Sequence, residues 1–254
     1  SSDGIKQWTR QLGSSSIDKG QSIATDSSGN VYITGYTWGG LDGNTNTTSM
    51  FLLDGLIPLC YGYETGLWSD IFVVKYDSSG NKQWTRQLGS CDDDEGNDVA
   101  IDSSGNVYIT GDTYDKLDGN VHAGQHDVFV VKYNSIGNKQ WTRQLGSTGR
   151  EIGTGITTDS SNNLYVTGWT DGGLDGNQNT GYRDFFAAKY NSGGIKQWTV
   201  QHGSSDLEEG YGIVTDSSGS FYITGHTLGG LDGNTSAGNR DLFVVKYDTN
   251  GNKQ

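Results

Sequence analysis

The sequence predicts an all-β fold, a β-propeller of four four-stranded blades whose ring is closed by the N-terminal strand. The first observation is a repeat: the pattern from Asp127 to Gly146 recurs at residues 70–89, more loosely at 184–203, and in shortened form at 241–254. The second observation is that the chain opens with the second half of this pattern, at 4–13, so the repeat is split between the two termini. A fixed period decides architecture more firmly than local propensity does.

One domain is expected over residues 1–254, because the repeat runs through the chain and no linker interrupts it. The equivalent glycines at 89, 146 and 203 are 57 residues apart, whereas the step from Gly13 to Gly89 is 76 and contains an insertion within 45–69. This insertion has apolar runs, and we expect it to fold over the loop face or to contact another subunit. The predicted units are blade 1 at 13–88, blade 2 at 89–145, blade 3 at 146–202, and blade 4 at 203–254 plus 1–12.

Each repeat has the pattern of four short strands separated by turn residues. In the second repeat, Val107 and Ile109 alternate with Tyr108, so they face opposite sides of a strand, whereas the Val-Phe-Val-Val run that follows Asp127 is apolar on both sides. A small sheet that is apolar on both faces must stack on another copy. Radial stacking gives a propeller, and a linear solenoid is the alternative. The strands expected in this repeat are 97–102, 106–113, 127–133 and 138–145.

The split repeat makes Gly4–Leu12 the expected outer strand of the last blade, paired with Asp241–Tyr247. Closure of the ring in this way would protect sheet edges that are otherwise exposed. An open arc that forms part of something larger is the alternative.

Three recurring motifs carry a family resemblance. They are Gly-Asn-Val-Tyr-Ile-Thr-Gly at 29–35 and 105–111, Asp-x-Phe-Val-Val-Lys-Tyr at 70–76, 127–133 and 241–247, and Gly-Asn-Lys-Gln-Trp at 80–84 and 137–141. The chain resembles the bacterial β-propeller repeat family known as SBBP over nearly its whole length except the insertion. The resemblance implies a propeller module of bacterial surface and secreted proteins, and it implies no catalytic residues. The family name suggests seven blades, whereas this chain has four.

The composition narrows the class of partner. The formal net charge is −13, and this argues against nucleic acid or an anionic membrane surface as a partner, because both need clustered Lys and Arg. No apolar run is long enough to span a membrane, so membrane insertion is not expected. The acidic composition, rich in Asn and Gly turns, is typical of exported bacterial proteins, and we expect an extracellular or cell-surface location.

The two edges of each predicted sheet differ. The connections at one edge are short and nearly identical Asp-Ser-Ser-Gly turns, whereas those at the other edge are longer and differ among units, and binding sites concentrate on such loops. Aromatic and polar side chains gather there, as in sugar-binding loops, although packing of the rim explains them equally well. The candidate ligand-binding residues are Trp38, Tyr114, Trp169 and His226.

The same loops carry Leu-Asp-Gly-Asn four times, and in the third repeat oxygen-bearing side chains follow at alternate positions, as in calcium loops. Calcium is therefore a possible cofactor. The pattern departs from an EF-hand because Gly181 stands at the seventh position and no Glu stands at the twelfth. A turn in which Asp caps backbone amides and Gly supplies a positive φ is the alternative. The candidate calcium ligands are Asp42, Asn44, Asp118, Asn120, Asp175, Asn177, Asp184, Asp232 and Asn234.

Three further features are weaker. Cys60 and Cys91 lie in connections on the same face and could form a disulfide, with two free thiols as the alternative. His122 and His126 have a spacing that occurs in zinc sites, but they lie in a loop.

The acidic runs 92–95 and 206–209 could supply paired carboxylates for hydrolysis, although the carboxylates of such runs are usually exposed to solvent. The chain has no nucleophile motif.

These observations favour an exported, non-enzymatic binding or adhesion module that recognises an extracellular protein or glycan through its long-loop face. A structural subunit of an extracellular fibre or surface layer, built by self-association, is the main alternative, because the partial blades at both termini could pair between chains. A hydrolase that uses the acidic runs is the second alternative.

Overall fold

The computed structural model describes residues 3–47 and 68–254, and these form four antiparallel sheets that we call A to D. Sheet A contains β1 (Asp18–Thr25), β2 (Val31–Thr37), β3 (Asp70–Tyr76) and β4 (Lys82–Leu88). Sheet B contains β5 (Asp94–Ile101), β6 (Val107–Thr113), β7 (Asp127–Tyr133) and β8 (Lys139–Leu145). Sheet C contains β9 (Glu151–Thr158), β10 (Leu164–Thr170), β11 (Asp184–Tyr190) and β12 (Lys196–His202). Sheet D has three strands, β13 (Glu208–Thr215), β14 (Phe221–Thr227) and β15 (Asp241–Tyr247).

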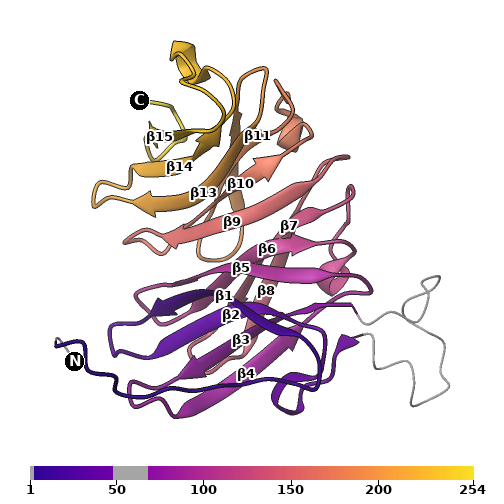
Figure 1. The fold of residues 1–254 in the computed structure, drawn as a ribbon, viewed down its shortest axis with the longest axis vertical. Coiled ribbons are helices and arrows are strands. Elements are labelled where there is room, and N and C mark those ends of the chain that lie inside the picture. Colours follow the sequence, from indigo (N-terminus) through magenta and orange to yellow (C-terminus); the bar gives the residue numbers. More distant parts are fainter. Residues whose placement is uncertain (1–2, 48–67) are drawn as a thin grey trace.

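The strands of each sheet follow chain order, and the sheets stack face to face in sequence from A to D (Figure 1). The N-terminus lies at the sheet A end of this array and the C-terminus at the sheet D end. The first strands of neighbouring sheets lie next to one another, β1 beside β5, β5 beside β9, and β9 beside β13. The predicted all-β, propeller-like stacking of repeats is therefore confirmed. Among the described residues, no helix is long and apolar enough to cross a membrane.

The apolar core lies between the sheets, as the alternation in the sequence predicts. Val107 and Ile109 pack toward sheet A, whereas Tyr108 on the opposite face packs toward sheet C. The third strand is buried on both faces: Phe129 and Val131 join the core shared with sheet A, and Val128 and Val130 join the core shared with sheet C. A strand between two neighbouring sheets has no face left for water, and this explains why its sequence does not alternate with polar residues.

A bulge in the first strand of each sheet brings the second strand unusually close. In sheet B the register shifts between Gly96 and Asp98, and the backbone of Gly111 on β6 lies against the carbonyl of Glu95. A Cβ atom at position 111 would lie 1.8 Å from that oxygen, so only glycine fits. The same contact recurs at Gly35, Gly168 and Gly225, and this explains the Thr-Gly pair of every repeat.

The short turns between the first and second strands are held by one aspartate each. Asp102 accepts hydrogen bonds from the backbone N–H groups of Ser104 and Asn106 and from the hydroxyl of Tyr108, whose ring lies in the core. Burial and this hydrogen bond raise the pKa of Tyr108 far above its usual value. The turn is therefore fastened to the core by its own side chains, in agreement with a structural role for this edge.

The predicted closure of the ring is not confirmed. Residues 4–12 form no strand with β15, and they lie along sheet A at the other end of the array (Figure 1). Trp8 Nε1 donates to Ser78 O at 3.2 Å and Arg10 Nε donates to Gly80 O at 2.6 Å. Sheet D consequently keeps an edge without a fourth strand, where Lys253 forms an isolated bridge to Tyr247 and the backbone N–H of Gln254 donates to Lys246 O at 2.9 Å.

The physical reason is that the Trp-Thr-Arg motif makes two sets of contacts. In β4, Arg86 pairs with its own sheet through the backbone and also donates through Nε to Gly137 O of sheet B at 2.6 Å. Arg143 does the same toward Gly194 O of sheet C. The sequence pattern shows that residues 4–12 carry this motif, but it does not show which of the two sets of contacts these residues make. In this structure the contacts with the following sheet form and those with the preceding sheet do not.

Most of the insertion lies outside the described residues, which exclude 48–67. Its predicted role as a cover or a subunit contact therefore stays a prediction. Cys60 lies in the same excluded stretch, so the Cys60–Cys91 disulfide also stays a prediction.

Candidate ligand-binding cleft on the long-loop face

The long-loop face is formed by the β2–β3, β6–β7, β10–β11 and β14–β15 connections together with the connections between sheets. Three equivalent positions in each sheet place side chains there, and the residue types differ among the sheets. The penultimate residue of the second strand is Tyr36, Asp112, Trp169 or His226. The residue before the third strand is Ser69, His126, Arg183 or Arg240. The second residue of the first strand, which lies opposite the first set, is Lys19, Glu95, Ile152 or Glu209.

In sheet B these positions form a closed cluster. The rings of Tyr114 and His126 lie with their centres 3.6 Å apart, and His126 Nδ1 lies 3.1 Å from Asp112 Oδ2. Asn97 on the neighbouring strand donates to the other oxygen of Asp112 at 3.0 Å. The polar atoms of Asp112 are thus bound within the protein, and the cluster offers little to a ligand.

Between sheets C and D three residues from these positions, Arg183, Glu209 and Arg240, line an open cleft of about 620 Å³, a size typical of small-molecule sites. The guanidinium of Arg183 lies 3.8 Å from the centre of the Trp169 ring and forms an ion pair with Glu209 of sheet D. Arg150 donates through Nε to Asp171 at 2.8 Å and lies beside the same Trp169 ring. The polar side chains that line the cleft are Arg150, Asp171, Asn179, Tyr182, Arg183, Glu209 and Arg240.

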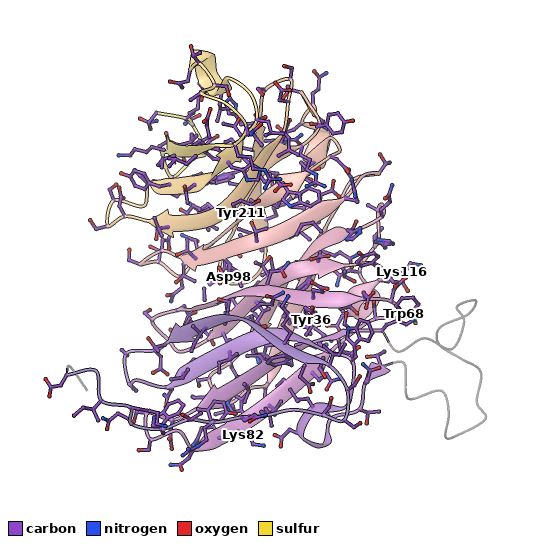
Figure 2. All side chains as sticks on the ribbon, in the orientation of Figure 1. Tyr36, Trp68, Lys82, Asp98, Lys116 and Tyr211 are labelled. Carbon is purple, nitrogen blue, oxygen red and sulfur yellow. The ribbon has the colours of Figure 1, made fainter. Side chains whose placement is uncertain are left out.

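Glu209 connects the cleft to two further groups of sheet D. It accepts a hydrogen bond from the hydroxyl of Tyr211 at 2.6 Å, and burial together with this bond raises the pKa of Tyr211 to about 12. Tyr211, labelled in Figure 2, lies on β13 and its side chain is exposed. His226 Nε2 lies 3.8 Å from Glu209, and burial, aided by the charges of Arg240 and Arg183, lowers the pKa of His226 although Glu209 opposes this. Near neutral pH both Tyr211 and His226 are therefore uncharged.

The six arginines of the chain fall into two sets of three. Arg10, Arg86 and Arg143 belong to the Trp-Thr-Arg motif, and each donates through Nε to the carbonyl of a turn glycine in an adjacent sheet. Arg150, Arg183 and Arg240 stand outside the motif, and all three line the cleft between sheets C and D. One set is explained by the repeat, and the other set is not.

Comparison with known proteins bears on the repeat. A family model described as "Beta-propeller repeat", SBBP, matches residues 7–42, 83–117 and 140–175. The chain carries SBBP repeats. The resemblance seen in the motifs is thereby confirmed. Each match begins at the Gln-Trp-Thr-Arg segment and ends at the Leu-Asp turn of the next sheet, so the matched unit joins this segment to the first two strands that follow it.

Two relatives of this chain are longer proteins of low sequence identity. The chain is 26% identical to an uncharacterised WD repeat-containing protein of Acanthamoeba polyphaga mimivirus over 83% of its own length. It is 28% identical to the regulatory protein FlaEY of Caulobacter vibrioides over 60% of this chain. The chain spans 18% of the length of each of these relatives.

Among solved structures, a polysaccharide lyase of family PL25, an ulvan lyase bound to -[GlcA(1-4)Rha3S]-, is similar with a TM-score of 0.50 and 12% identity. The similarity covers 95% of this chain and 57% of that chain. At this identity the likeness concerns the fold alone.

The structure separates the four candidate residues predicted on this face. Trp169 lies beneath Arg183 at the cleft, and His226 lies behind Glu209. Tyr114 belongs to the cluster in sheet B, and Trp38 directly follows β2 of sheet A, where its backbone N–H donates to Ile17 O at 2.9 Å. The sequence prediction missed the three cleft arginines. The signal that could have found them is that they are the only arginines outside the Trp-Thr-Arg motif of the SBBP repeat.

The Leu-Asp-Gly-Asn loops adopt the same turn in all four sheets. Each Asp has a φ between 53° and 56°, and the Asn side chain donates to the carbonyl of the Leu, as in the 2.7 Å bond from Asn44 to Leu41. Each Asp carboxylate is also paired with the lysine that opens the fourth strand or its equivalent: Asp42 with Lys82, Asp118 with Lys139, Asp175 with Lys196, and Asp232 with Lys253.

Calcium binding at these loops stays a prediction, and a cation there would have to displace the lysine. Asp184 is buried at the start of β11, where it accepts hydrogen bonds from the side chain of Gln201 and from the backbone N–H and hydroxyl of Thr180, each at 3.0 Å. Within residues 3–47 and 68–254, no group of three or more His, Cys, Asp or Glu side chains has an arrangement suited to a metal ion.

The two acidic runs contain residues that occupy one equivalent structural position. Asp94 and Glu208 each accept hydrogen bonds from the backbone N–H and hydroxyl of the serine four residues earlier, Ser90 or Ser204. Asp18 and Glu151 do the same in the other two sheets. Because this contact recurs in every repeat, one acidic residue of each run, Asp94 or Glu208, serves the fold.

Proposed function

We propose that this chain is an exported, non-enzymatic binding module that holds an extracellular partner, a protein or a glycan, on its long-loop face. The observation that carries the proposal is the cleft between sheets C and D. The repeat keeps the core and the short turns nearly constant, yet it places Trp169, Arg183 and Glu209 together at one site where the other sheets have different residues. Side chains that depart from the repeat at one place are best explained by a ligand.

A binding role is favoured over catalysis by the state of the ionisable groups. Tyr211, with its pKa raised to about 12, keeps its proton at neutral pH and is a poor general base. The carboxylate of Glu209 is engaged by Arg183 and Tyr211, and Glu208 binds Ser204 and Thr227. The groups at the cleft are thus arranged to donate and accept hydrogen bonds, and both carboxyls among the described residues that line it, Asp171 and Glu209, are engaged by arginines.

A glycan is the partner that we favour. The similar polysaccharide lyase is bound to a saccharide, which makes a sugar ligand reasonable for a protein of related fold, although the likeness itself extends only to the fold. Tyr182 on the rim of the cleft is 81% exposed, and a flat exposed ring suits the apolar face of a sugar.

A glycan array and a binding screen against extracellular proteins test the proposal. Wild type is expected to bind at least one saccharide, and Trp169→Ala and Tyr182→Ala should each weaken that binding. Val121→Ala, which removes an exposed apolar side chain from the long-loop face of sheet B, is the matched control and should not weaken it. If wild type binds neither a glycan nor a surface protein, the binding role is wrong.

A structural subunit remains a second candidate because of a specific observation on sheet D. Leu242 and Val244 on β15 are 82% and 64% exposed, whereas the equivalent Val128 and Val130 on β7 are each 1% exposed. The face of sheet D thus has the composition of a face that another sheet covers. Sheet A, whose Ile23 is 66% exposed, offers the complementary face, either in the same chain through ring closure or in a second copy.

The size of the chain in solution as a function of concentration separates these arrangements. Head-to-tail assembly gives a mass that grows with concentration and that Leu242→Asp abolishes. Ring closure gives a concentration-independent monomer that Leu242→Asp destabilises. If Leu242→Asp changes neither mass nor stability, both arrangements are wrong.

A further inference from the structure

The cleft between sheets C and D concentrates positive charge in an acidic protein. Arg150, Arg183 and Arg240 reach it from three different connections, although the whole chain has a net charge of −13 and only six arginines. Their guanidinium groups come from positions that in sheets A and B hold residues without a permanent positive charge, such as Ser69 and Asp93. The repeat does not need these arginines, so their convergence requires another explanation.

Two of these arginines form ion pairs with carboxylates, and the third does not. Arg150 is paired with Asp171 and Arg183 with Glu209, whereas Arg240 is exposed and makes no ion pair or hydrogen bond within residues 3–47 and 68–254. Among the charged side chains that line the cleft, one positive charge is therefore in excess. The side chain of Arg150 is also 41% exposed, so it can bind a ligand while it keeps its ion pair with Asp171. A guanidinium group can bind a carboxylate or sulfate through two parallel hydrogen bonds.

We infer that this cleft binds an anionic saccharide, with Arg240 and Arg150 on its carboxylate or sulfate groups and the ring of Tyr182 against a sugar face. The inference rests on the proposed binding function and names the class of its ligand. The amide of Asn179 and the neutral hydroxyl of Tyr211 supply further polar groups near the cleft for sugar hydroxyls.

The observations favour a saccharide over other polyanions. Double-stranded nucleic acid carries one charge per about 1.7 Å, so the negative charge of the rest of this protein would oppose its approach. A saccharide that carries one acidic group per one or two sugars meets far less repulsion, and it offers hydroxyls and apolar ring faces to the polar and aromatic lining. An acidic peptide shares the carboxylates but has neither of these features.

Isothermal titration of the 254-residue chain with four defined ligands tests the inference. The ligands are a uronic acid oligosaccharide, the same oligosaccharide with its carboxyls reduced to alcohols, a sulfated neutral oligosaccharide, and an oligoglutamate. The test variant is Arg240→Gln. The matched control is Lys116→Gln, which removes one positive charge from an exposed site on the long-loop face of sheet B (Figure 2). Neither side chain has a partner in the fold among the described residues, so both variants should melt as wild type does.

Wild type is expected to bind an acidic saccharide, carboxylated or sulfated, at least about tenfold more tightly than the reduced one, the effect of one charge-assisted contact. Arg240→Gln should lose about tenfold and Lys116→Gln should not. Comparison of the uronic acid oligosaccharide with the sulfated neutral oligosaccharide identifies whether the site binds carboxylate or sulfate groups.

Four results would overturn the inference. Equal binding of the reduced saccharide would leave the proposed function standing and remove the anionic class. Equal losses in Arg240→Gln and Lys116→Gln would mean that general charge, and no specific site, attracts the ligand. Preference for oligoglutamate would replace the saccharide with an acidic peptide. Absence of any saccharide binding here and on the glycan array would remove the saccharide ligand altogether.

Discussion

The guanidinium of Arg183 lies 3.8 Å from the centre of the Trp169 ring and also forms an ion pair with Glu209, so one side chain joins sheet C to sheet D across the candidate cleft. Both contacts hold Arg183 over the ring, since a guanidinium can stack on an aromatic face and bind a carboxylate in its own plane. The position of Glu209, and through it the states of Tyr211 and His226, depends on this arginine.

Removal of Arg183 is therefore expected to raise the pKa of His226. Burial comes first among the causes that lower this pKa, and the charges of Arg240 and Arg183 add to it, whereas Glu209 raises it. Arg183→Met removes one lowering charge and frees Glu209 to act on the imidazole, so both changes have the same sign. Titration of the His226 ring by NMR measures the effect. Lys116→Gln should leave it unchanged, and a lower or constant pKa in Arg183→Met would contradict the coupling.

The bulge beside the long-loop face predicts a large cost for a small substitution. Gly111→Ala would place a Cβ atom 1.8 Å from Glu95 O, and the backbone must move to relieve the clash. We expect the free energy of unfolding to fall by about 1–3 kcal/mol or more. Gly238→Ala is the control, because an added Cβ there meets nothing within 4 Å. Urea denaturation measures both variants, and similar stabilities would show that the close approach of β5 and β6 is not rigid.

The buried Asp94 predicts a pH dependence of stability. Burial raises the pKa of Asp94 well above 3.8, and the negative charge of Asp70 raises it further. The hydrogen bonds that Asp94 accepts from Ser90 and Thr113 lower this pKa but do not outweigh burial. Between 3.8 and this higher pKa the folded state holds a proton that the unfolded state has lost, so the contribution of Asp94 to stability falls as pH rises. Asp94→Asn should remove this slope and make the protein more stable than wild type at neutral pH, as measured by denaturation at several pH values.

Asp77 provides a control of opposite sign. Hydrogen bonds from the backbone and side chain of Asn81 lower the pKa of the exposed Asp77, so its contribution is present above the ordinary Asp pKa and is lost as pH falls. Asp77→Asn should therefore remove stability that wild type has at neutral pH. If both variants shift the pH profile in the same direction, the assignment of Asp94 is wrong.

The sequence predicted the repeat-determined parts of this fold well, because they depend on local period. Val107, Tyr108 and Ile109 alternate between two cores as a period of two requires, and the observed β7 has the bounds 127–133 that were predicted. The cleft could not be predicted in this way. Arg150 and Arg183 lie in separate connections of the third repeat and Arg240 lies in the fourth repeat, and only the stacking of sheet D on sheet C brings the three connections to one place.

The closure of the ring could not be predicted for a different reason. Residues 4–12 have the sequence of an outer strand, but such a strand contacts both its own sheet and the next one, as Arg86 does. The similarity of residues 4–12 to β4, β8 and β12 indicates that this segment is suited to both contacts. Which of the two contacts forms depends on the relative free energies of the two interfaces and on the geometry of the whole array, and the local sequence pattern determines neither.

The Leu-Asp-Gly-Asn loops predict a specific response to calcium. Because the carboxylate of Asp175 is already bound to Lys196 and Thr199, and each equivalent Asp in the other sheets is also paired with a lysine, we expect millimolar Ca²⁺ to leave the melting temperature unchanged. Differential scanning calorimetry with Ca²⁺ and with a chelator measures this. A rise with Ca²⁺ that Asp175→Asn reduces would favour the calcium site over the turn.

The N-terminal segment predicts a stability effect that reports where it packs. Trp8 lies against Gly80, its ring is 6.3 Å from that of Tyr76, and its indole N–H binds Ser78 O, so all of these contacts are with sheet A. Trp8→Ala should lower the free energy of unfolding by about 1–3 kcal/mol, through lost burial of a large aromatic side chain at a partly exposed site.

The location of that effect distinguishes the open array from a ring. In the open array, hydrogen exchange in Trp8→Ala should increase in β3 and in the turn between β3 and β4, which the segment contacts, and should not change in β15. In a closed ring the same segment would also pair with β15, so amides of residues 241–247 would lose protection as well. Ile136→Ala, at an exposed turn of sheet B that Trp8 does not touch, controls for general loosening. If amides of β15 lose protection together with those of β3 and the turn after it, the ring closes in solution. If amides of neither region lose protection, the N-terminal segment is not packed at all.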